Sequence, residues 1–293
     1  MQKNKLLDWA IFLLLTLIWG SSFILMKHSK EQLTAPQIAA LRIFSAGLVF
    51  LPFAMFHLAK LPRKKLLFVI LSGITDNLLP AFLYASAITV IDSSLAAILN
   101  SLTPVFVAVI AITFFKDKIK LQKILGILIG LIGVVVLFYS SKEGKINFQY
   151  FGYASLILLA TIFYGMNVNM VSHFLKDVNP VHIATVSIAF MIIPTAFVLW
   201  QQHFLQLAFE DEKVQFAILE SVMLGIVGTA IATALFYVLI KRAGGLFASL
   251  VTYSIPVVGI IWGIADGEIV GPIQFGCLAI ILAGVYITSK NSK

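Results

Sequence analysis

Two side chains that can carry a full charge, Arg42 and Asp76, lie inside long apolar stretches. An ionisable group at the centre of a membrane-spanning helix costs about 2.5–3.5 kcal/mol on insertion scales, so such groups are candidates for function. Asp76 follows Lys65 by 11 residues, about 16 Å of helix, and Arg42 follows Pro36 by 6 residues, about 9 Å. In a core of about 30 Å crossed from opposite faces, their depths differ by about 5 Å. We therefore expect both groups to face one cavity and to pair, directly or through water.

The chemistry open to this pair is either structural or functional. The pair could lock two helices together, or the carboxyl group could take and release a proton while a solute moves. Burial favours the neutral form of Asp76, whereas a nearby Arg42 favours the charged form. The sequence leaves open whether Asp76 titrates or only pairs.

Further polar and aromatic side chains occur within the apolar stretches, where an amide without a partner is costly. Hydroxyl groups there can bond to their own helix or a neighbour instead of a ligand, and that alternative stays open. A cavity wall that combines aromatic rings with amides suits a small zwitterion or an amphipathic metabolite. The candidate substrate-binding or pathway residues, with Arg42 and Asp76, are Trp19, Ser22, Asn77, Tyr84, Asn100, Ser101, Tyr164, Asn167, Thr229, Tyr237, Thr252 and Tyr253.

Three prolines lie close to these candidates, at positions 80, 104 and 256. Proline removes a backbone hydrogen bond and clashes with the preceding turn, so each one predicts a kink. We expect Pro80, Pro104 and Pro256 to act as hinges, with Pro104 and Pro256 forming a symmetric pair. Plain structural kinks without movement are the alternative.

The elements that position these residues follow from composition. The chain of 293 residues is 60% hydrophobic and only 12% charged, whereas a soluble domain carries about 25% charged residues. So few charges cannot cover a water-facing surface, which excludes disorder, a nucleic-acid-binding module and a conventional soluble enzyme. The single cysteine, Cys277, excludes a disulfide framework and a multi-cysteine metal site. No His-x-x-x-His motif or paired carboxylates appear in the spans, so we expect no metal, no cofactor and no enzymatic activity.

Ten stretches are long and apolar enough to cross a bilayer, which takes about 20 residues each. We therefore predict an all-α membrane protein, and we interpret the first stretch as a retained span, not a cleaved signal peptide. The predicted spans are Trp9 to Met26, Gln37 to Ala59, Leu66 to Val90, Leu95 to Phe115, Leu121 to Tyr139, Tyr150 to Val171, Val181 to Trp200, Val214 to Ile240, Leu246 to Ala265 and Pro272 to Thr288.

Basic residues indicate the orientation, because cytoplasmic segments are enriched in them. With the N-terminus inside, 15 of the 21 lysines and arginines lie in inner segments and 5 in outer ones, while Arg42 lies within a span. Both termini are therefore predicted to be cytoplasmic, and the net charge of +8 needs no nucleic-acid partner to explain it.

The chain also repeats itself. Trp19-Gly20 recurs as Tyr164-Gly165, and Leu102-Thr103-Pro104-Val105 recurs as Ser254-Ile255-Pro256-Val257. Each half holds five predicted spans, an odd number, so the second half must enter the membrane from the opposite side. Inverted repeats of this kind are typical of secondary transporters, with the substrate site near the midplane. The positions equivalent to Arg42 and Asp76, near Val186 and Gly228, are uncharged, which favours a functional role for the charges.

Several segments resemble the drug/metabolite transporter superfamily, and within it the ten-helix EamA-type proteins. They are Leu17-Ile18-Trp19-Gly20-Ser21-Ser22-Phe23, Leu41-Arg42, the stretch from Ser94 to Phe106, the stretch from Ala248 to Val257, Glu268, and Gly284-Val285. The resemblance implies two EamA repeats, residues 8–140 and 150–289, and a proton-linked or facilitated exporter of amino acids, other metabolites or drugs. Family sequences often carry a small residue where Asp76 stands, so its role cannot be taken from the resemblance.

We therefore expect a secondary transporter that exports a small metabolite, an amino acid or a related amphipathic compound, by alternating access at a midplane cavity between the halves. A channel-like or scramblase-like facilitator of small-molecule or lipid movement is the alternative. The expected partners are a small-molecule substrate, the lipid bilayer and, as a candidate coupling ion, protons. We expect a multi-pass protein of the cell membrane, specifically the bacterial inner membrane, that is a monomer or a weak dimer. Its Gly126-x-x-x-Gly130 and Gly259-x-x-x-Gly263 motifs are expected to pack helices within the fold.

Overall fold

The computed structural model describes residues 5–91, 96, 99–140, 148–265 and 272–289, and this part of the chain is helical without strands. Six helical stretches are long and apolar enough to cross a membrane: Lys5–Met26, Ala35–Ala59, Arg63–Ile88, Gly152–His173, Pro180–Gln201 and Glu212–Ala243. Four shorter apolar helices, Thr103–Thr113, Leu121–Gly133, Gly245–Gly259 and Phe275–Thr288, lie within the other four predicted spans.

The described helices of the first half correspond to the five predicted spans, and span 3 is interrupted by a π-helix. Span 1 is α1 (Lys5–Ser29) and span 2 is α2 (Ala35–Ala59). Span 3 consists of a 3-10 turn, α3, a π-helix and α4, and the described parts of spans 4 and 5 are α6 and α7. Their bounds are η1 (Arg63–Lys65), α3 (Leu66–Gly73), η2 (Ile74–Leu78), α4 (Leu79–Ile88), α6 (Thr103–Thr113) and α7 (Leu121–Ser140).

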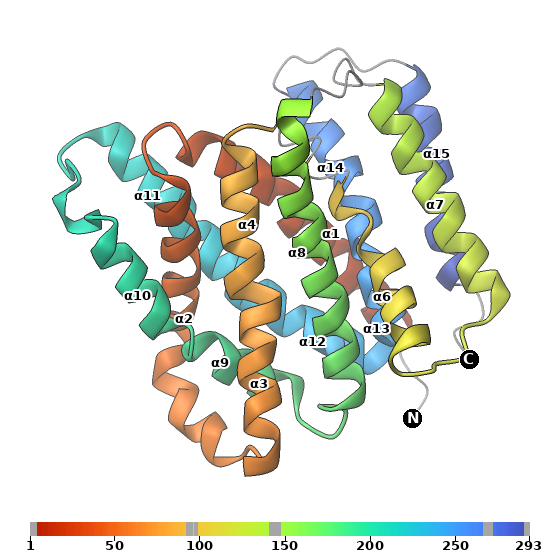
Figure 1. The fold of residues 1–293 in the computed structure, drawn as a ribbon, viewed down its shortest axis with the longest axis horizontal. Coiled ribbons are helices and arrows are strands. Elements are labelled where there is room, and N and C mark those ends of the chain that lie inside the picture. The colour runs from red at the N-terminus through yellow and green to blue at the C-terminus, as the bar shows by residue number, and fades with distance from the viewer. Residues whose placement is uncertain (1–4, 92–95, 97–98, 141–147, 266–271, 290–293) are drawn as a thin grey trace.

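The second half follows the same order, and its span 8 is again interrupted by a π-helix. Helices α7 and α15 stand side by side at one edge of the molecule, while α10 and α11 lie at the opposite edge (Figure 1). The bounds are α8 (Phe148–His173), α9 (Pro180–Ala189), α10 (Ile192–Gln201), η3 (Phe204–Gln206), α11 (Glu212–Gly225), η4 (Ile226–Ile231), α12 (Ala232–Ala243), α13 (Gly245–Ser249), α14 (Val251–Ala265) and α15 (Pro272–Ser289).

Equivalent residues start the second span of each half. Thr34 caps α2 through a capping box in which Thr34 Oγ1 accepts from the backbone of Gln37 and the Gln37 side chain accepts from the Thr34 backbone. In the second half Asn179, 145 positions later, caps α9 by accepting from the Val181 backbone. A proline occupies the first turn of both helices, where its missing N–H costs nothing.

The two π-helices are also equivalent, since Ile74 and Ile226 begin them 152 positions apart. Each follows a glycine that packs against the second span of the other half. A Cβ atom at Gly73 would clash with the Ser187 carbonyl on α9, and one at Gly225 would clash with Arg42 and Ser45 on α2. The halves therefore interlock by reciprocal glycine contacts, which bring spans 3 and 8 close to the centre.

The predicted prolines do not form a symmetric pair of kinks. Pro80 lies in the first turn of α4, and the irregular backbone is the π-helix that precedes it. Pro104 starts α6 directly after a turn, whereas Pro256 lies inside the continuous helix α14. In span 9 the break falls earlier, at Leu250 between α13 and α14. A proline inside a helix can be accommodated by bending alone, so its position did not locate the break.

One of the two expected glycine packing motifs is confirmed. A Cβ atom added at Gly126 on α7 would meet Thr288 of α15, and one added at Gly130 would meet the Tyr253 ring of α14, while Gly284 on α15 approaches the backbone of Gly130. Gly259, from the second motif, has open space beside it, and the surroundings of Gly263 lie outside what the structure describes. Large apolar side chains such as Met55 and Phe114 are exposed on the outside, as expected for a surface in contact with lipid.

Candidate functional site

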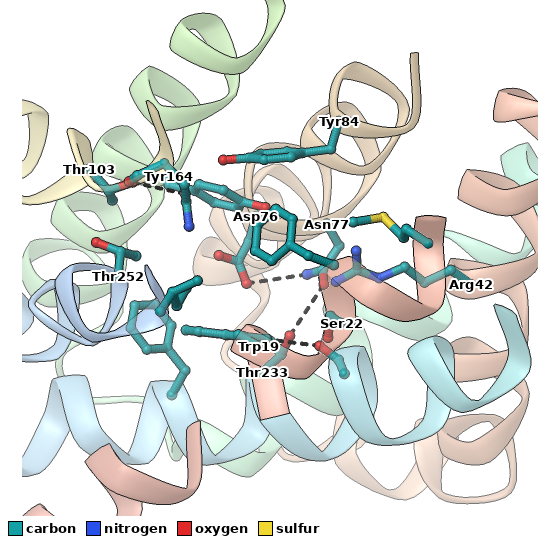
Figure 2. A pocket seen from close by; sticks show the side chains of 16 residues that line it. Trp19, Ser22, Arg42, Asp76, Asn77, Tyr84, Thr103, Tyr164, Thr233 and Thr252 are labelled. Carbon is teal, nitrogen blue, oxygen red and sulfur yellow. Dashed lines mark hydrogen bonds between the residues drawn. The ribbon is translucent and has the colours of Figure 1, made fainter. Parts of the chain in front are cut away.

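A cavity of about 80 Å³ lies between the two halves, with room for two or three water molecules at about 30 Å³ each. Helices α1, α2, α4, α8 and α12 contribute to its wall, together with both π-helices and the starts of α6 and α14 (Figure 2). Its lining residues are Trp19, Ser22, Phe23, Met26, Arg42, Asp76, Asn77, Tyr84, Asn100, Thr103, Tyr164, Gly228, Thr233, Phe236, Thr252 and Ile255.

Arg42 and Asp76 both line this cavity, as expected. Of the two arrangements expected for them, a direct pair or a pair through water, the direct pair is not formed. Arg42 Nε donates instead to Thr229 Oγ1 over 2.7 Å, and no ion pair joins Arg42 to Asp76 among the described residues. The Thr229 hydroxyl donates in turn to the Leu224 carbonyl over 3.2 Å, so its lone pair is free to accept from Arg42. A neutral oxygen on the π-helix η4 therefore orients the guanidinium group and leaves its terminal nitrogens facing the cavity.

Asp76 is held by neutral donors. Tyr237 Oη donates to Asp76 Oδ2 over 3.0 Å, and Asn77 Nδ2 donates to the same oxygen over 3.3 Å. Behind it, Ser72 Oγ donates to Asn167 Oδ1 over 2.6 Å and lies 2.8 Å from Tyr237 Oη. Because Tyr237, Ser72 and Asn167 are fully buried, this network fixes the carboxyl group at the cavity wall.

One face of span 8 meets the polar residues of the first half turn by turn. Thr229, Thr233 and Tyr237 follow at intervals of four residues, which places them on the same side of a helix. Thr229 accepts from Arg42, and Thr233 donates to Asn77 Oδ1 over 3.2 Å. Tyr237 continues the series with its bond to the carboxyl group of Asp76. The site is thus assembled only when both halves are in place.

Aromatic rings close the cavity on two sides. Trp19 Nε1 donates to the Gly228 carbonyl over 3.0 Å, and its ring packs edge-on against Phe236 with centroids 5.1 Å apart. On the other side the ring of Tyr84 lies 6.2 Å from the ring of Tyr164. The Tyr84 hydroxyl is buried and has no hydrogen-bond partner in the structure. A buried polar atom of this kind is rare and indicates a place where a bound molecule can complete the bonding.

Nine of the predicted site residues line the cavity, and five do not. Thr229, Tyr237 and Asn167 lie directly behind it and hold the two ionisable groups. Ser101 bonds to the Thr252 carbonyl over 3.1 Å, and Tyr253 bonds to the Ile127 carbonyl over 2.8 Å. The Tyr253 ring packs against Gly130 on α7, so in this structure Tyr253 joins helices and does not reach the cavity.

Several lining residues were not predicted. Thr233 could have been found, because it lies one turn from both Thr229 and Tyr237 on the same helical face, and Thr103 lies next to the candidate Asn100 in the same way. The remaining ones give no sequence signal, because apolar side chains and glycine are common throughout the spans. They are Phe23, Met26, Gly228, Phe236 and Ile255.

Among the described residues, no group of three or more His, Cys, Asp or Glu side chains is placed to hold a metal ion. The chemistry of the cavity is that of recognition: a cation, a carboxyl group, amides, hydroxyl groups and aromatic rings around a small polar space.

Comparison with known proteins identifies the fold and the family. A protein from Archaeoglobus fulgidus described as an uncharacterized transporter is 25% identical over 288 residues, which cover 97% of this chain and 99% of that protein. A crystal structure of a protein is similar over 96% of both chains, with a TM-score of 0.71 and 19% sequence identity, so it shares the fold. The sequence model of the EamA-like transporter family matches residues 8–139 and again residues 152–290. The apolar helices and this double match show a multi-pass membrane transporter rather than an enzyme, and the chain belongs to the EamA-like transporter family.

Proposed function

We propose that the protein is a secondary transporter that exports a small metabolite, an amino acid or a related amphipathic compound, through the central cavity. The observation that carries the proposal is the placement of Arg42 and Asp76 in one cavity without an ion pair between them. A zwitterion supplies the missing complement, with its carboxylate on the guanidinium group and its ammonium group on Asp76. The unpartnered hydroxyl of Tyr84 offers a further bond.

Alternating access accounts for the small size of the cavity. The space of about 80 Å³ is below the 300–1,000 Å³ typical of small-molecule sites, so an amino acid requires the halves to separate on one side. We propose that residues 8–140 and 150–289 form inverted halves of five spans each, with both termini in the cytoplasm. Rocking of these halves about the midplane opens the cavity to each side in turn. Pro80, Pro104 and Pro256 are the proposed hinges.

We further propose that the protein works in the bacterial inner membrane as a monomer or weak dimer and that protons drive export. Asp76 is the candidate proton carrier, since its carboxyl group faces the cavity while neutral donors hold it. Loading with a proton and loading with substrate would then compete for the same oxygen atoms, which couples the two fluxes.

The experiment that tests the proposal is counterflow in proteoliposomes, with substrates chosen by metabolite profiling of cells with and without overexpression. Saturable exchange of an amino acid is expected. Asp76→Asn should lose the pH dependence of exchange, because the amide keeps the bond to Tyr237 but cannot titrate. Asp211→Asn is the matched control: Asp211 caps α11 at the surface, where asparagine caps equally well.

Two results would contradict the proposal. An Asp76→Asn protein with unchanged rate and pH dependence removes this residue from the coupling mechanism. Flux that rises without saturation as solute concentration increases supports instead the channel-like or scramblase-like alternative.

A further inference from the structure

A second cavity, of about 390 Å³, lies near the end of the molecule where α1 begins and α15 ends (Figure 1). It is formed by α6, α8, α13 and the connection between α6 and α7. None of the residues predicted for the transport path lines it, and its volume falls within the range of small-molecule sites.

The second cavity continues the central one along the same helices. On α6, Thr103 lines the central cavity, and Val107 and Ala111 line the second, about 6 and 12 Å further along the helix. On α8, Tyr164 lines the central cavity and Ser172 the second, again about 12 Å apart. The two spaces are therefore stacked along one axis.

Only a thin apolar layer separates the two cavities. Val107, Val168 and Ala248 come from α6, α8 and α13, belong to one hydrophobic cluster and are 2%, 1% and 0% exposed. Asn169 Nδ2 donates to the Val107 carbonyl over 3.0 Å and ties α8 to α6 at this level. Gly245 brings α13 close enough that an added Cβ atom would lie 2.6 Å from Val168 Cγ1. The structure is thus closed at this layer.

The second cavity is strongly cationic. Lys118, Lys120 and Lys123 line it, and none of their side chains has a hydrogen-bond or ion-pair partner among the described residues. The acidic residue in the lining, Asp117, is already engaged by His173 Nε2 on α8 over 3.1 Å. Enrichment of lysine at cytoplasmic ends explains why basic residues occur here, but not why three of them surround a cavity whose one carboxylate is engaged.

We propose that this lysine-lined cavity is the cytoplasmic vestibule of the transport path and that it selects solutes carrying an anionic group. The inference rests on the proposed function and narrows its substrate class to compounds with a carboxylate or phosphate. The anionic group is held first by the lysines and, once the layer at Val107 and Val168 opens, by Arg42 in the central cavity. Opening requires α6 and α13 to part from α8.

Thiol chemistry inside the vestibule tests the charge selection directly. Ser172 lines the vestibule, and its hydroxyl bonds only to its own helix at Val168, so Ser172→Cys is a mild change. In a Cys277→Ala background the new thiol is the sole cysteine. The purified protein is reacted with an anionic reagent, 2-sulfonatoethyl methanethiosulfonate, and with a cationic one, 2-(trimethylammonium)ethyl methanethiosulfonate, and the two rates are compared.

Relative to the rate of each reagent with a small free thiol, the anionic reagent should be favoured. Replacing the three lysines by glutamine should lower the ratio of the anionic to the cationic rate by about tenfold, because the two rates change in opposite directions. The matched control replaces Lys60, Arg63 and Lys64 by glutamine, which removes the same charge from the α2–α3 connection. The ratio should stay within about twofold there. An equal ratio in wild type and lysine variant, or an equal effect of the control, overturns the proposal.

A second measurement tests whether the vestibule lies on the path. Modification of the Ser172→Cys thiol by the anionic reagent should stop counterflow of the exchanged amino acid, and dithiothreitol should restore it. Undiminished counterflow after complete modification overturns the role in transport.

The same thiol distinguishes a solute from a lipid headgroup, which shares the phosphate chemistry. Vesicles of phosphatidylcholine are compared with vesicles in which one fifth of the lipid is phosphatidylglycerol. Equal protection of the Ser172→Cys thiol from the reagent in both kinds of vesicle supports a solute vestibule. Strong protection by phosphatidylglycerol assigns the cavity to a lipid headgroup and overturns the proposed vestibule. If the unmodified protein shows no saturable exchange while the charge effect persists, the proposed function fails and the cavity remains only an anion site.

Discussion

The hydrogen bond from Arg42 to Thr229 offers the sharpest test of how the site is assembled. Thr229→Val keeps the shape of the side chain but removes the oxygen that accepts from Arg42 Nε at 2.7 Å and that donates to the Leu224 carbonyl. Bonds to charged groups contribute about 1.5–3 kcal/mol in soluble proteins, while interhelical bonds in membranes average about 0.6 and reach about 1.7 kcal/mol. Because Arg42 borders a cavity that water can occupy, part of this loss is recovered by hydration. We expect a loss of about 1–2 kcal/mol.

The assay is thermal unfolding in detergent, followed by the fluorescence of the four tryptophans. At about 2–4 °C per kcal/mol, Thr229→Val should lower the melting temperature by roughly 2–8 °C. Thr229→Ser, which keeps the hydroxyl group, should recover most of this loss. Thr195→Val is the matched control, since Thr195 is equally buried but its hydroxyl group donates only to nearby backbone carbonyls, those of Met191 and Ile192.

The reasoning is refuted if Thr229→Val destabilises the protein no more than Thr195→Val does. It is also refuted if Thr229→Ser is as harmful as Thr229→Val, because the effect would then come from packing of the methyl group and not from the hydrogen bond.

Three further predictions use the same unfolding measurement. Tyr237→Phe removes three bonds of one buried hydroxyl group and should lower the free energy of unfolding by about 1–3 kcal/mol. An unchanged melting temperature would show that the network does not stabilise the protein. Gly225→Ala forces the start of the second π-helix away from α2 and should lower the free energy of unfolding by about 1–3 kcal/mol. Gly152→Ala, at a position with open space, should be neutral or stabilising by up to about 1 kcal/mol. Equal effects of the two substitutions would contradict the packing argument. Asp8→Asn weakens the 2.5 Å bond to Arg242 that joins α1 to α12 and should lower the free energy of unfolding by about 1 kcal/mol. High salt should reduce the difference between the variant and the wild type, because it screens the ion pair in the wild type.

The sequence was most informative about the depth of the charged residues in the membrane and least informative about their hydrogen-bond partners. Counting residues from the ends of the spans placed Arg42 and Asp76 at similar depths, and both line one cavity. The direct form of the expected pair is absent, and Thr229 and Tyr237, from the other half, bond to the two groups separately. Contacts between residues about 160–190 positions apart depend on how the halves dock, which helical periodicity does not describe.

Symmetry in the sequence was a good guide to backbone and a poor guide to side-chain roles. The structure extends the repeat to equivalent caps at Thr34 and Asn179 and to the two π-helices, which have no sequence signature of their own. Symmetry misled at Tyr253, whose position in the repeat suggested a place on the path. Its ring packs against Gly130 instead, where the absence of a side chain on α7 leaves room for it.

The two π-helices also determine how the residues of spans 3 and 8 can change without disturbing the packing of the two halves. A π-turn accommodates one additional residue, which rotates everything beyond it by about 100° relative to a regular α-helix. The part of span 3 before the π-turn contacts α9 through Gly73, and the part that begins with Asp76 faces the cavity. Each span therefore behaves as two short helices with independent facing surfaces, so that the lining of the cavity can change during evolution while the interlock between the halves stays the same.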